Sequence, residues 1–390
     1  MTTATPRLSA ADPLNLEAEY TDFERELRDR TRAFAQEHIA PNVQSWWDAE
    51  SIPRDLIVEF GKLGIIGLMH QRGGEQHAIA YGLVNAELDA VDSGVRTLFS
   101  VQGGLAMTAI YRFGSDEQRA HYLPRMRTGE ILGAFALTEP ESGSDPGSMT
   151  CTARRDGSDW ILNGHKRWNT NCLIADIVIT WVRTDEGIRG FIVPTDAKGL
   201  ERRAVTGKYS LRAAAATEFE MHDVRLPADA VLPGVSGLAG PLACLSEARY
   251  GIIWGMLGVM RSCIEAALDH STTRVQFGKP IGAFQLTQAK LTEMLLRYSQ
   301  AQLLAHQIGR LKQRGELTTE QVSMGKLNNV NAAIEVAHTA RGILGGNGVT
   351  SMYPVMRHMA NLESILTYEG TAEVHTLIIG QGLTGLSAFR

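Results

Sequence analysis

One acidic residue near the end of the chain has surroundings suited to proton transfer. Glu369 lies between Tyr368 and Gly370, directly after the uncharged run 364–367. Burial among such neighbours disfavours the charged form of a carboxyl group and raises its pKa. A carboxylate tuned in this way can act as a general base near neutral pH. The alternative is a glutamate at the end of a helix that Gly370 terminates.

A second candidate for chemistry is Arg96, which lies in the otherwise apolar and helical stretch 93–102. If Arg96 is exposed, it can pair with Asp92 four residues earlier, as is common on helix surfaces. If it is buried, an unpaired guanidinium would be costly, and the pocket around it should accept a negatively charged group. The sequence leaves both interpretations open.

The sequence contains no pattern typical of a metal site or of an activated nucleophile. It has no HExxH, GxSxG or Walker motif, and its four cysteines are scattered without a CxxC spacing. The glycine-rich run 345–348 follows a helical pattern and lacks the GxGxxG spacing, which argues against a Rossmann fold. Its backbone amides could approach a phosphate closely, or the run could simply end a helix.

Composition limits the class of protein. A chain of 390 residues with 44% hydrophobic and 21% charged residues predicts a globular protein of two or three domains. The net charge of −5 and the lack of a dense basic run argue against a nucleic-acid surface. No apolar stretch approaches the length expected of a membrane span, and residues 1–19 resemble a flexible arm rather than a targeting signal. We therefore expect a cytoplasmic protein.

The hydrophobic pattern divides the chain into three parts and predicts an α+β protein. Residues 1–134 are mostly helical, residues 135–240 contain short β-type runs separated by turn signals, and residues 241–390 are helical again. The middle part contains two predicted hairpins, with turns near residues 156–158 and 184–187. In the last part, Gly251, Gly255 and Gly258 recur at helical spacing, which suits close helix packing.

Five stretches give the chain a resemblance to the acyl-CoA dehydrogenase family, and most closely to its glutaryl-CoA dehydrogenases. They are LTEPESGSD (137–145), NGHKRWNTN (163–171), RVQFG (274–278), LGGNG (344–348) and YEGT (368–371). The resemblance extends from about residue 16 to residue 389. It implies an N-terminal helical domain, a middle β-barrel-like domain, a C-terminal four-helix bundle and FAD as cofactor.

The resemblance also assigns roles to individual residues. It implies that Glu369 is the catalytic base that removes the α-proton, while the β-hydride passes to the flavin. The residues that it places at the substrate are Arg96, Ser100, Ser144, Arg249 and Tyr368. Those that it places at FAD are Leu137, Thr138, Ser144, Trp168, Thr170, Arg274, Gln276, Phe277, Gln285, Leu344, Gly345, Gly346, Gly348 and Thr371. Of these, Arg274, Gln276 and Phe277 would reach the FAD of a neighbouring subunit, which implies a homotetramer.

In glutaryl-CoA dehydrogenases the residues matching Arg96 and Ser100 hold the distal carboxylate of the substrate. The resemblance thus implies dehydrogenation of glutaryl-CoA, decarboxylation to crotonyl-CoA and electron transfer to an electron-transfer flavoprotein. Asn169 and Asp89 depart from the family pattern. They leave open a pathway-specific enzyme that acts on a carrier-protein-bound or functionalised acyl chain and resolves the dienolate differently. A flavin-binding structural or nucleic-acid-protecting relative is a third class, against which Glu369 and the acidic charge argue.

Overall fold

The N-terminal part of the protein is helical, as predicted. The computed structural model describes residues 8–70 and 73–389. A π-helical segment, η4 (Val101–Met107), joins α5 to α6, so that these helices form one nearly continuous rod. The helices of this part are α1 (Asp22–Phe34), α2 (Val43–Asp48), α3 (Leu56–Lys62), α4 (Ala78–Val91), α5 (Ser93–Ser100), α6 (Thr108–Phe113) and α7 (Asp116–Arg127).

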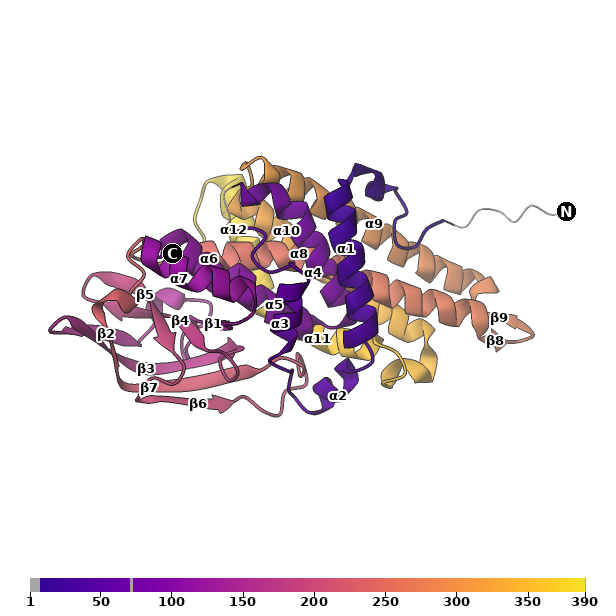
Figure 1. The fold of residues 1–390 in the computed structure, drawn as a ribbon. Coiled ribbons are helices and arrows are strands. Elements are labelled where there is room, and N and C mark those ends of the chain that lie inside the picture. The colour runs from indigo at the N-terminus through magenta and orange to yellow at the C-terminus, as the bar shows by residue number, and fades with distance from the viewer. Residues whose placement is uncertain (1–7, 71–72, 390) are drawn as a thin grey trace.

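The middle part is a mixed seven-stranded sheet, which lies at one end of the molecule (Figure 1). Its order is β1-β4-β2-β3-β7-β6, and β5 pairs with β4. Both predicted hairpins are confirmed, because β2 pairs antiparallel with β3 and β4 with β5. The strands are β1 (Gly133–Ala136), β2 (Thr152–Asp156), β3 (Asp159–Thr170), β4 (Ile177–Thr184), β5 (Gly187–Pro194), β6 (Leu200–Ala204) and β7 (Ala216–Leu226).

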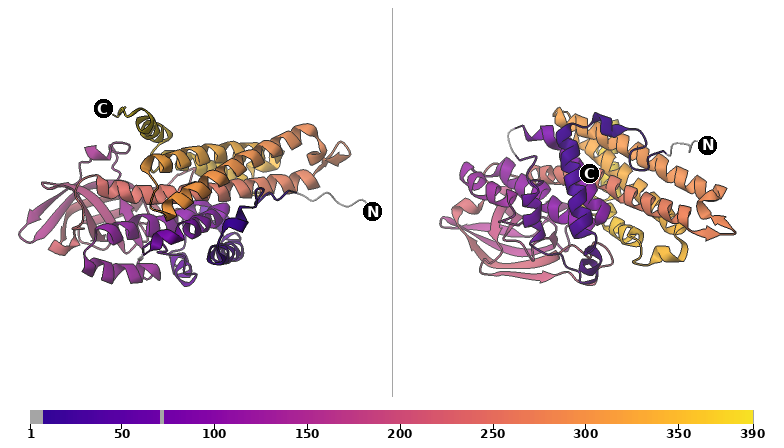
Figure 2. Two further views of the ribbon diagram at one scale, coloured as in Figure 1. Left: turned by 90° about the horizontal axis from the view of Figure 1, so that it is seen from above. Right: turned by 45° about the vertical axis from the view of Figure 1, so that its right-hand side comes forward.

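The C-terminal part is built from long helices that lie side by side (Figures 1 and 2). Between α8 and α9, the short strands β8 (Val275–Gln276) and β9 (Lys279–Pro280) form a hairpin at the end of the molecule opposite the seven-stranded sheet. The helices are α8 (Ala239–Thr273), α9 (Gln285–Gln313), α10 (Thr319–Ile343), α11 (Val355–Thr367) and α12 (Ala372–Thr384).

Helix α8 is the central helix of the protein. It is apolar and long enough to cross a membrane by length and composition, so the expectation that no stretch approaches that length was wrong. However, 78% of its most apolar window is buried inside the protein, which identifies α8 as a core helix. The predicted close packing is confirmed. A Cβ at Gly258 would lie 1.8 Å from the carbonyl oxygen of Ala86 on α4, and a Cβ at Gly255 would lie 1.9 Å from Oδ2 of Asp89.

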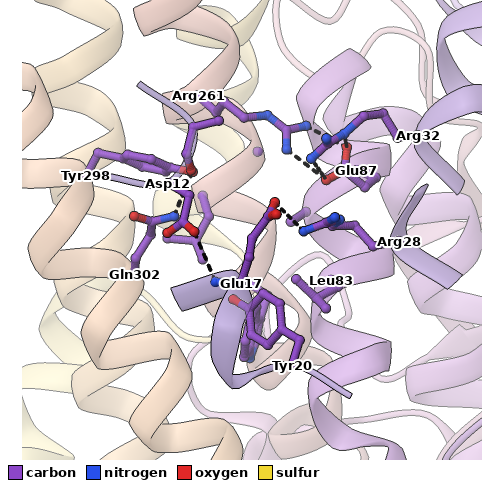
Figure 3. A pocket seen from close by; sticks show the side chains of 15 residues that line it. Asp12, Glu17, Tyr20, Arg28, Arg32, Leu83, Glu87, Arg261, Tyr298 and Gln302 are labelled. Atoms are coloured by element: carbon purple, nitrogen blue, oxygen red, sulfur yellow. Dashed lines mark hydrogen bonds and ion pairs between the residues drawn. The ribbon is translucent and has the colours of Figure 1, made fainter. Parts of the chain in front are cut away.

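The described part of the N-terminal arm, from residue 8 onward, packs against the helices, which corrects the prediction of a flexible arm. The carbonyl oxygen of Ala11 accepts hydrogen bonds from Tyr298 and Gln302 of α9. Nearby, the buried Glu87 of α4 pairs with Arg32 of α1 and Arg261 of α8 (Figure 3). These contacts join the N-terminal and C-terminal helices.

Candidate active site

Glu369 lies in a tight turn between α11 and α12. Its φ of 55° and the φ of 96° at Gly370 are both in the left-handed region, where a residue with a Cβ is strained. Gly370 tolerates this conformation because it has no Cβ. A Cβ there would also lie 3.0 Å from Nε2 of His375 and 3.3 Å from an Nη2 of Arg249. The turn therefore presents Glu369 in a fixed, strained conformation, and Gly370 does more than terminate a helix.

The carboxyl group of Glu369 has the electrostatic surroundings predicted from the sequence. Burial raises the pKa of Glu369, while the positive charges of Arg96, Lys326 and Arg249 act in the opposite direction. Its Oε2 atom is buried without a hydrogen-bond partner in the described part of the chain. A carboxylate with a raised pKa and a free oxygen atom is suited to accept a proton from a bound molecule.

Arg96 is completely buried, so the surface pair with Asp92 was wrong. Its Nε atom donates to Oδ2 of Asp89 at 2.9 Å, and neither side chain is exposed. Its Nη2 atom donates to the hydroxyl of Tyr368 at 2.5 Å, which links Arg96 to the residue that precedes Glu369. The premise that a buried Arg96 would be unpaired was also wrong, because Asp89 compensates its charge.

Asp92 has a structural role instead. Its Oδ1 atom accepts from the backbone N–H of Gly94 and caps the start of α5. Its Oδ2 atom accepts from Arg357 and Asn361 of α11. These bonds fix α5, which carries Arg96, against α11, which leads directly into the turn of Glu369.

Several buried polar atoms near Arg96 have no partner among the described residues. They include Nη1 of Arg96, Oγ of Ser100 and the hydroxyl of Tyr81. Gly104 leaves space beside two of them, since a Cβ there would lie 3.1 Å from the Tyr81 hydroxyl and 3.5 Å from Oγ of Ser100. Buried polar groups need partners, so this cluster can bind polar groups of a ligand.

The loop 137–145 and the end of β3 form a second site beside the sheet. The backbone N–H of Arg167 donates to the carbonyl oxygen of Thr138 at 3.0 Å, which brings Trp168 next to the loop. Trp168 has a φ of 65° and is 55% exposed, although a tryptophan at a strand end is usually part of a core. Leu137 is buried, Thr138 and Thr170 are half-buried, and Ser144 is exposed. An exposed indole held beside a polar loop fits a planar ring system.

The remaining predicted cofactor residues lie elsewhere. Arg274, Gln276 and Phe277 are exposed in the β8–β9 hairpin, where Phe277 is 93% exposed, and Gln285 begins α9 and is exposed as well. This hairpin and the sheet lie at opposite ends of the molecule, so one chain cannot bring both to one cofactor (Figure 1). Leu344 and Gly348 are buried around the turn after α10, Gly345 and Gly346 are exposed, and Thr371 caps α12.

Arg249 lies beside the Glu369 turn. It is buried on α8, and its Nε atom donates to the carbonyl oxygen of Glu369 at 2.7 Å. Lys326 was not predicted from the sequence, yet its Nζ atom donates to two carbonyl oxygens of the same turn. A signal was available, because Lys326 lies on the buried face of α10 with Val322, Asn329 and Val330. A lysine on such a face requires polar partners.

The structure thus joins a buried carboxylate to a cluster of buried hydrogen-bond donors, on a fold of helical, β and helical parts. Comparison with known families defines the class of protein. The chain belongs to the acyl-CoA dehydrogenase family, since residues 21–130, 134–224 and 236–384 match its N-terminal, middle and C-terminal domains. This confirms the fold class and the prediction of an acyl-CoA dehydrogenase.

Among individual proteins, the chain is 35% identical to an acyl-CoA dehydrogenase of Bacillus subtilis, over 92% of this chain and 97% of that protein. It is 53% identical to the crystal structure of glutaryl-CoA dehydrogenase from Mycobacterium smegmatis, with a TM-score of 0.96 over 98% of this chain and 100% of the other. A second glutaryl-CoA dehydrogenase structure from this organism, in complex with FADH2, is 46% identical with the same TM-score and coverage. The predicted flavoprotein class is thereby confirmed.

Proposed function

We propose that the protein catalyses the FAD-dependent α,β-dehydrogenation of a dicarboxylic acyl-CoA, namely glutaryl-CoA, followed by decarboxylation to crotonyl-CoA. The observation that carries this proposal is the position of the Arg96 guanidinium. It is buried, bonded to Tyr368 next to Glu369, and retains a free Nη1 atom. The similarity to two glutaryl-CoA dehydrogenase structures supports the same substrate.

In this mechanism Glu369 is the general base. Its carboxylate takes the proton from the carbon atom next to the thioester, and the raised pKa makes this transfer favourable near neutral pH. When bound, FAD supplies the acceptor for the hydride that leaves the β-carbon. Burial of Glu369 also excludes water from the reacting atoms. Loss of CO2 from the unsaturated acyl-CoA leaves a dienolate, and the protonated Glu369 can return its proton to this dienolate to give crotonyl-CoA.

Arg96 and Ser100 are proposed to hold the distal carboxylate of the substrate. Nη1 of Arg96 and Oγ of Ser100 are both buried without partners among the described residues. They lie four residues apart on α5, so they share one helix face. A carboxylate that accepts hydrogen bonds from both would give each of these buried donors an acceptor. Buried donors without an acceptor destabilise the protein.

The proposed FAD site combines the loop 137–145 and Trp168 of one chain with the β8–β9 hairpin of another. The exposed indole and the half-buried Thr138 and Thr170 fit a flavin ring. The exposed Phe277 and Arg274 are free to contact a second copy. This division supports an oligomer with shared FAD sites. We propose that the oligomer is a homotetramer in the cytoplasm, with an electron-transfer flavoprotein as the electron acceptor.

Product analysis tests the proposed function. The purified protein with FAD, glutaryl-CoA and an artificial electron acceptor should give crotonyl-CoA and CO2, detected by mass spectrometry. Butyryl-CoA should be a poorer substrate. If flavin is reduced by butyryl-CoA and not by glutaryl-CoA, the dicarboxylic assignment is wrong, whereas the dehydrogenase class would still hold.

One observation favours a second candidate, an enzyme of a particular pathway that acts on a carrier-protein-bound or functionalised acyl chain. Because Asp89 already compensates the charge of Arg96, the pocket can also accept a neutral polar group, and the dienolate could then have a different fate. Comparing turnover of CoA and carrier-protein thioesters distinguishes the two candidates.

A further inference from the structure

Three successive carbonyl oxygens of the Glu369 turn accept hydrogen bonds from buried cationic side chains. Nζ of Lys326 donates to the carbonyl oxygen of Tyr368 at 2.6 Å and to that of Gly370 at 2.7 Å. Nε of Arg249 donates to the carbonyl oxygen of Glu369, between them, at 2.7 Å. These two side chains come from α10 and α8, so the turn is fixed to two different core helices.

Lys326 is only 1% exposed. The charged groups that affect the pKa of Lys326 are Glu369 in the turn, Arg249 on α8 and Arg96 on α5. The charge of Lys326 also lowers the pKa of His375 on α12. Burial lowers the pKa of Lys326, and the carboxylate of Glu369 counteracts this. An ammonium group has three donors, and two of them are used on the carbonyl oxygens that flank Glu369.

These bonds act where the backbone is strained. Two consecutive residues with positive φ persist only when the surrounding structure over-determines them. Lys326 holds the peptide group before Glu369 and the one after Gly370. Arg249 holds the peptide group between them, so the two side chains together restrict the backbone dihedrals that aim the carboxylate. Its positive charge also lowers the pKa of Glu369, against the effect of burial.

We propose that Lys326 is a positioning residue that fixes the Glu369 turn in its reactive geometry by donating hydrogen bonds to the carbonyl oxygens of Tyr368 and Gly370. The proposal rests on the proposed role of Glu369 as the base. It adds a function for a lysine whose two hydrogen bonds both go to the backbone of the turn.

Two substitutions of Lys326 distinguish the effect of its hydrogen bonds from the effect of its positive charge. Lys326→Met removes the donors and the charge, whereas Lys326→Gln removes the charge and keeps an amide donor. Lys208→Met is a matched control, because Nζ of Lys208 also donates to two backbone carbonyl oxygens, of Leu211 and Ala214, outside this turn. All variants are compared as folded, FAD-loaded protein by stopped-flow reduction of the flavin with glutaryl-CoA and with butyryl-CoA.

Lys326→Met should slow flavin reduction at saturating substrate about 100-fold, because misplacement of a reacting group by 1 Å has an effect of that size. Lys326→Gln should slow flavin reduction less, because its amide can still donate to one of the carbonyl oxygens. Both variants should shift the acidic limb of the pH–rate profile to higher pH. The reason is that they remove the positive charge of Lys326, which favours the ionised form of Glu369. Lys208→Met should change neither quantity, and substrate affinity should stay within a few-fold of wild type.

The proposal is wrong if the Lys326 variants match Lys208→Met in both rate and pH profile. It is also wrong if both Lys326 variants fail to fold with FAD while Lys208→Met folds, because Lys326 would then serve folding alone. Glu369→Gln is measured in parallel. Undiminished flavin reduction in that variant would reject Glu369 as the base, which is a failure of the proposed function and not of the Lys326 experiment.

Discussion

Arg96 and Asp89 form an ion pair, with 2.9 Å between Nε and Oδ2, in which neither side chain is exposed. The pair leaves Nη1 of Arg96 as a directional donor rather than a bare cation. Buried pairs of this kind are costly to break, because removal of one partner leaves the other charge uncompensated. In the proposed mechanism, substrate selection and local stability are therefore coupled at Arg96.

This coupling gives a prediction for Arg96→Met. Loss of the guanidinium leaves the carboxylate of Asp89 buried near the distal end of the acyl chain, where it repels a second carboxylate. We expect kcat/KM for glutaryl-CoA to fall roughly 100- to 1,000-fold, as for loss of one partner of a buried charge pair. The value for butyryl-CoA should fall by less than about tenfold. Equal losses on both substrates would contradict a role of Arg96 in binding a carboxylate.

The double substitution Arg96→Met with Asp89→Asn is the control for stability. It removes both charges, so the midpoint of urea unfolding should recover much of the loss caused by Arg96→Met. The preference for glutaryl-CoA should not return. Recovery of that preference in the double variant would contradict a direct role of Arg96 in binding the carboxylate.

Gly255 provides the space for the Asp89 carboxylate. A Cβ at this position would lie 1.9 Å from Oδ2 of Asp89, so Gly255→Ala must displace the buried ion pair. We expect a loss of about 1–3 kcal/mol in the free energy of unfolding, as for other overpacked cores. Gly342→Ala on α10 is the control. Apart from its chain neighbours and its own helix backbone, no atom of residues 8–70 and 73–389 lies within 4 Å of a Cβ added at Gly342. Alanine should therefore stabilise the helix by about 0.5–1 kcal/mol. Equal effects of the two substitutions would argue against the packing described at Gly255.

The buried His358 should make the protein less stable in acid. Burial lowers the pKa of His358 to about 3 from its ordinary value of 6.5. Its contribution is therefore fully present above pH 6.5 and is lost as the pH falls toward 3, since only the unfolded state binds the proton in that range. In His358→Asn, the slope of unfolding free energy against pH between pH 6 and 4 should decrease by about 1.4 kcal/mol per pH unit. Urea unfolding of both proteins across that range measures the slope, and an unchanged slope would contradict the buried neutral state of His358.

Much of the fold followed from local patterns in the sequence. The two hairpins, the division into helical, β and helical parts and the glycine spacing of α8 depend on periodicity and turn residues, which act over short distances. Glu369 could be singled out because its uncharged neighbours are adjacent in the chain.

The electrostatic partners of the site could not be predicted in the same way. Asp92, four residues before Arg96, satisfied the helical pairing rule, yet its side chain turns to Arg357, which is 265 residues away. Asp89 reaches Arg96 because a bend between α4 and α5 brings position 89 rather than 92 beside it. Lys326 approaches the Glu369 turn only through the packing of α10. Such contacts depend on tertiary structure, which a single sequence does not display.

Flavin reduction by Glu369→Gln tests the central claim most directly. Wild type and variant, each loaded with FAD, are mixed anaerobically with glutaryl-CoA, and the loss of the visible flavin absorbance is followed. The amide keeps the shape of the side chain and cannot take the α-proton, so reduction should slow by about 100- to 10,000-fold while FAD stays bound. Flavin reduction by Glu369→Gln at a rate near that of wild type would contradict the account, and another base would have to be found.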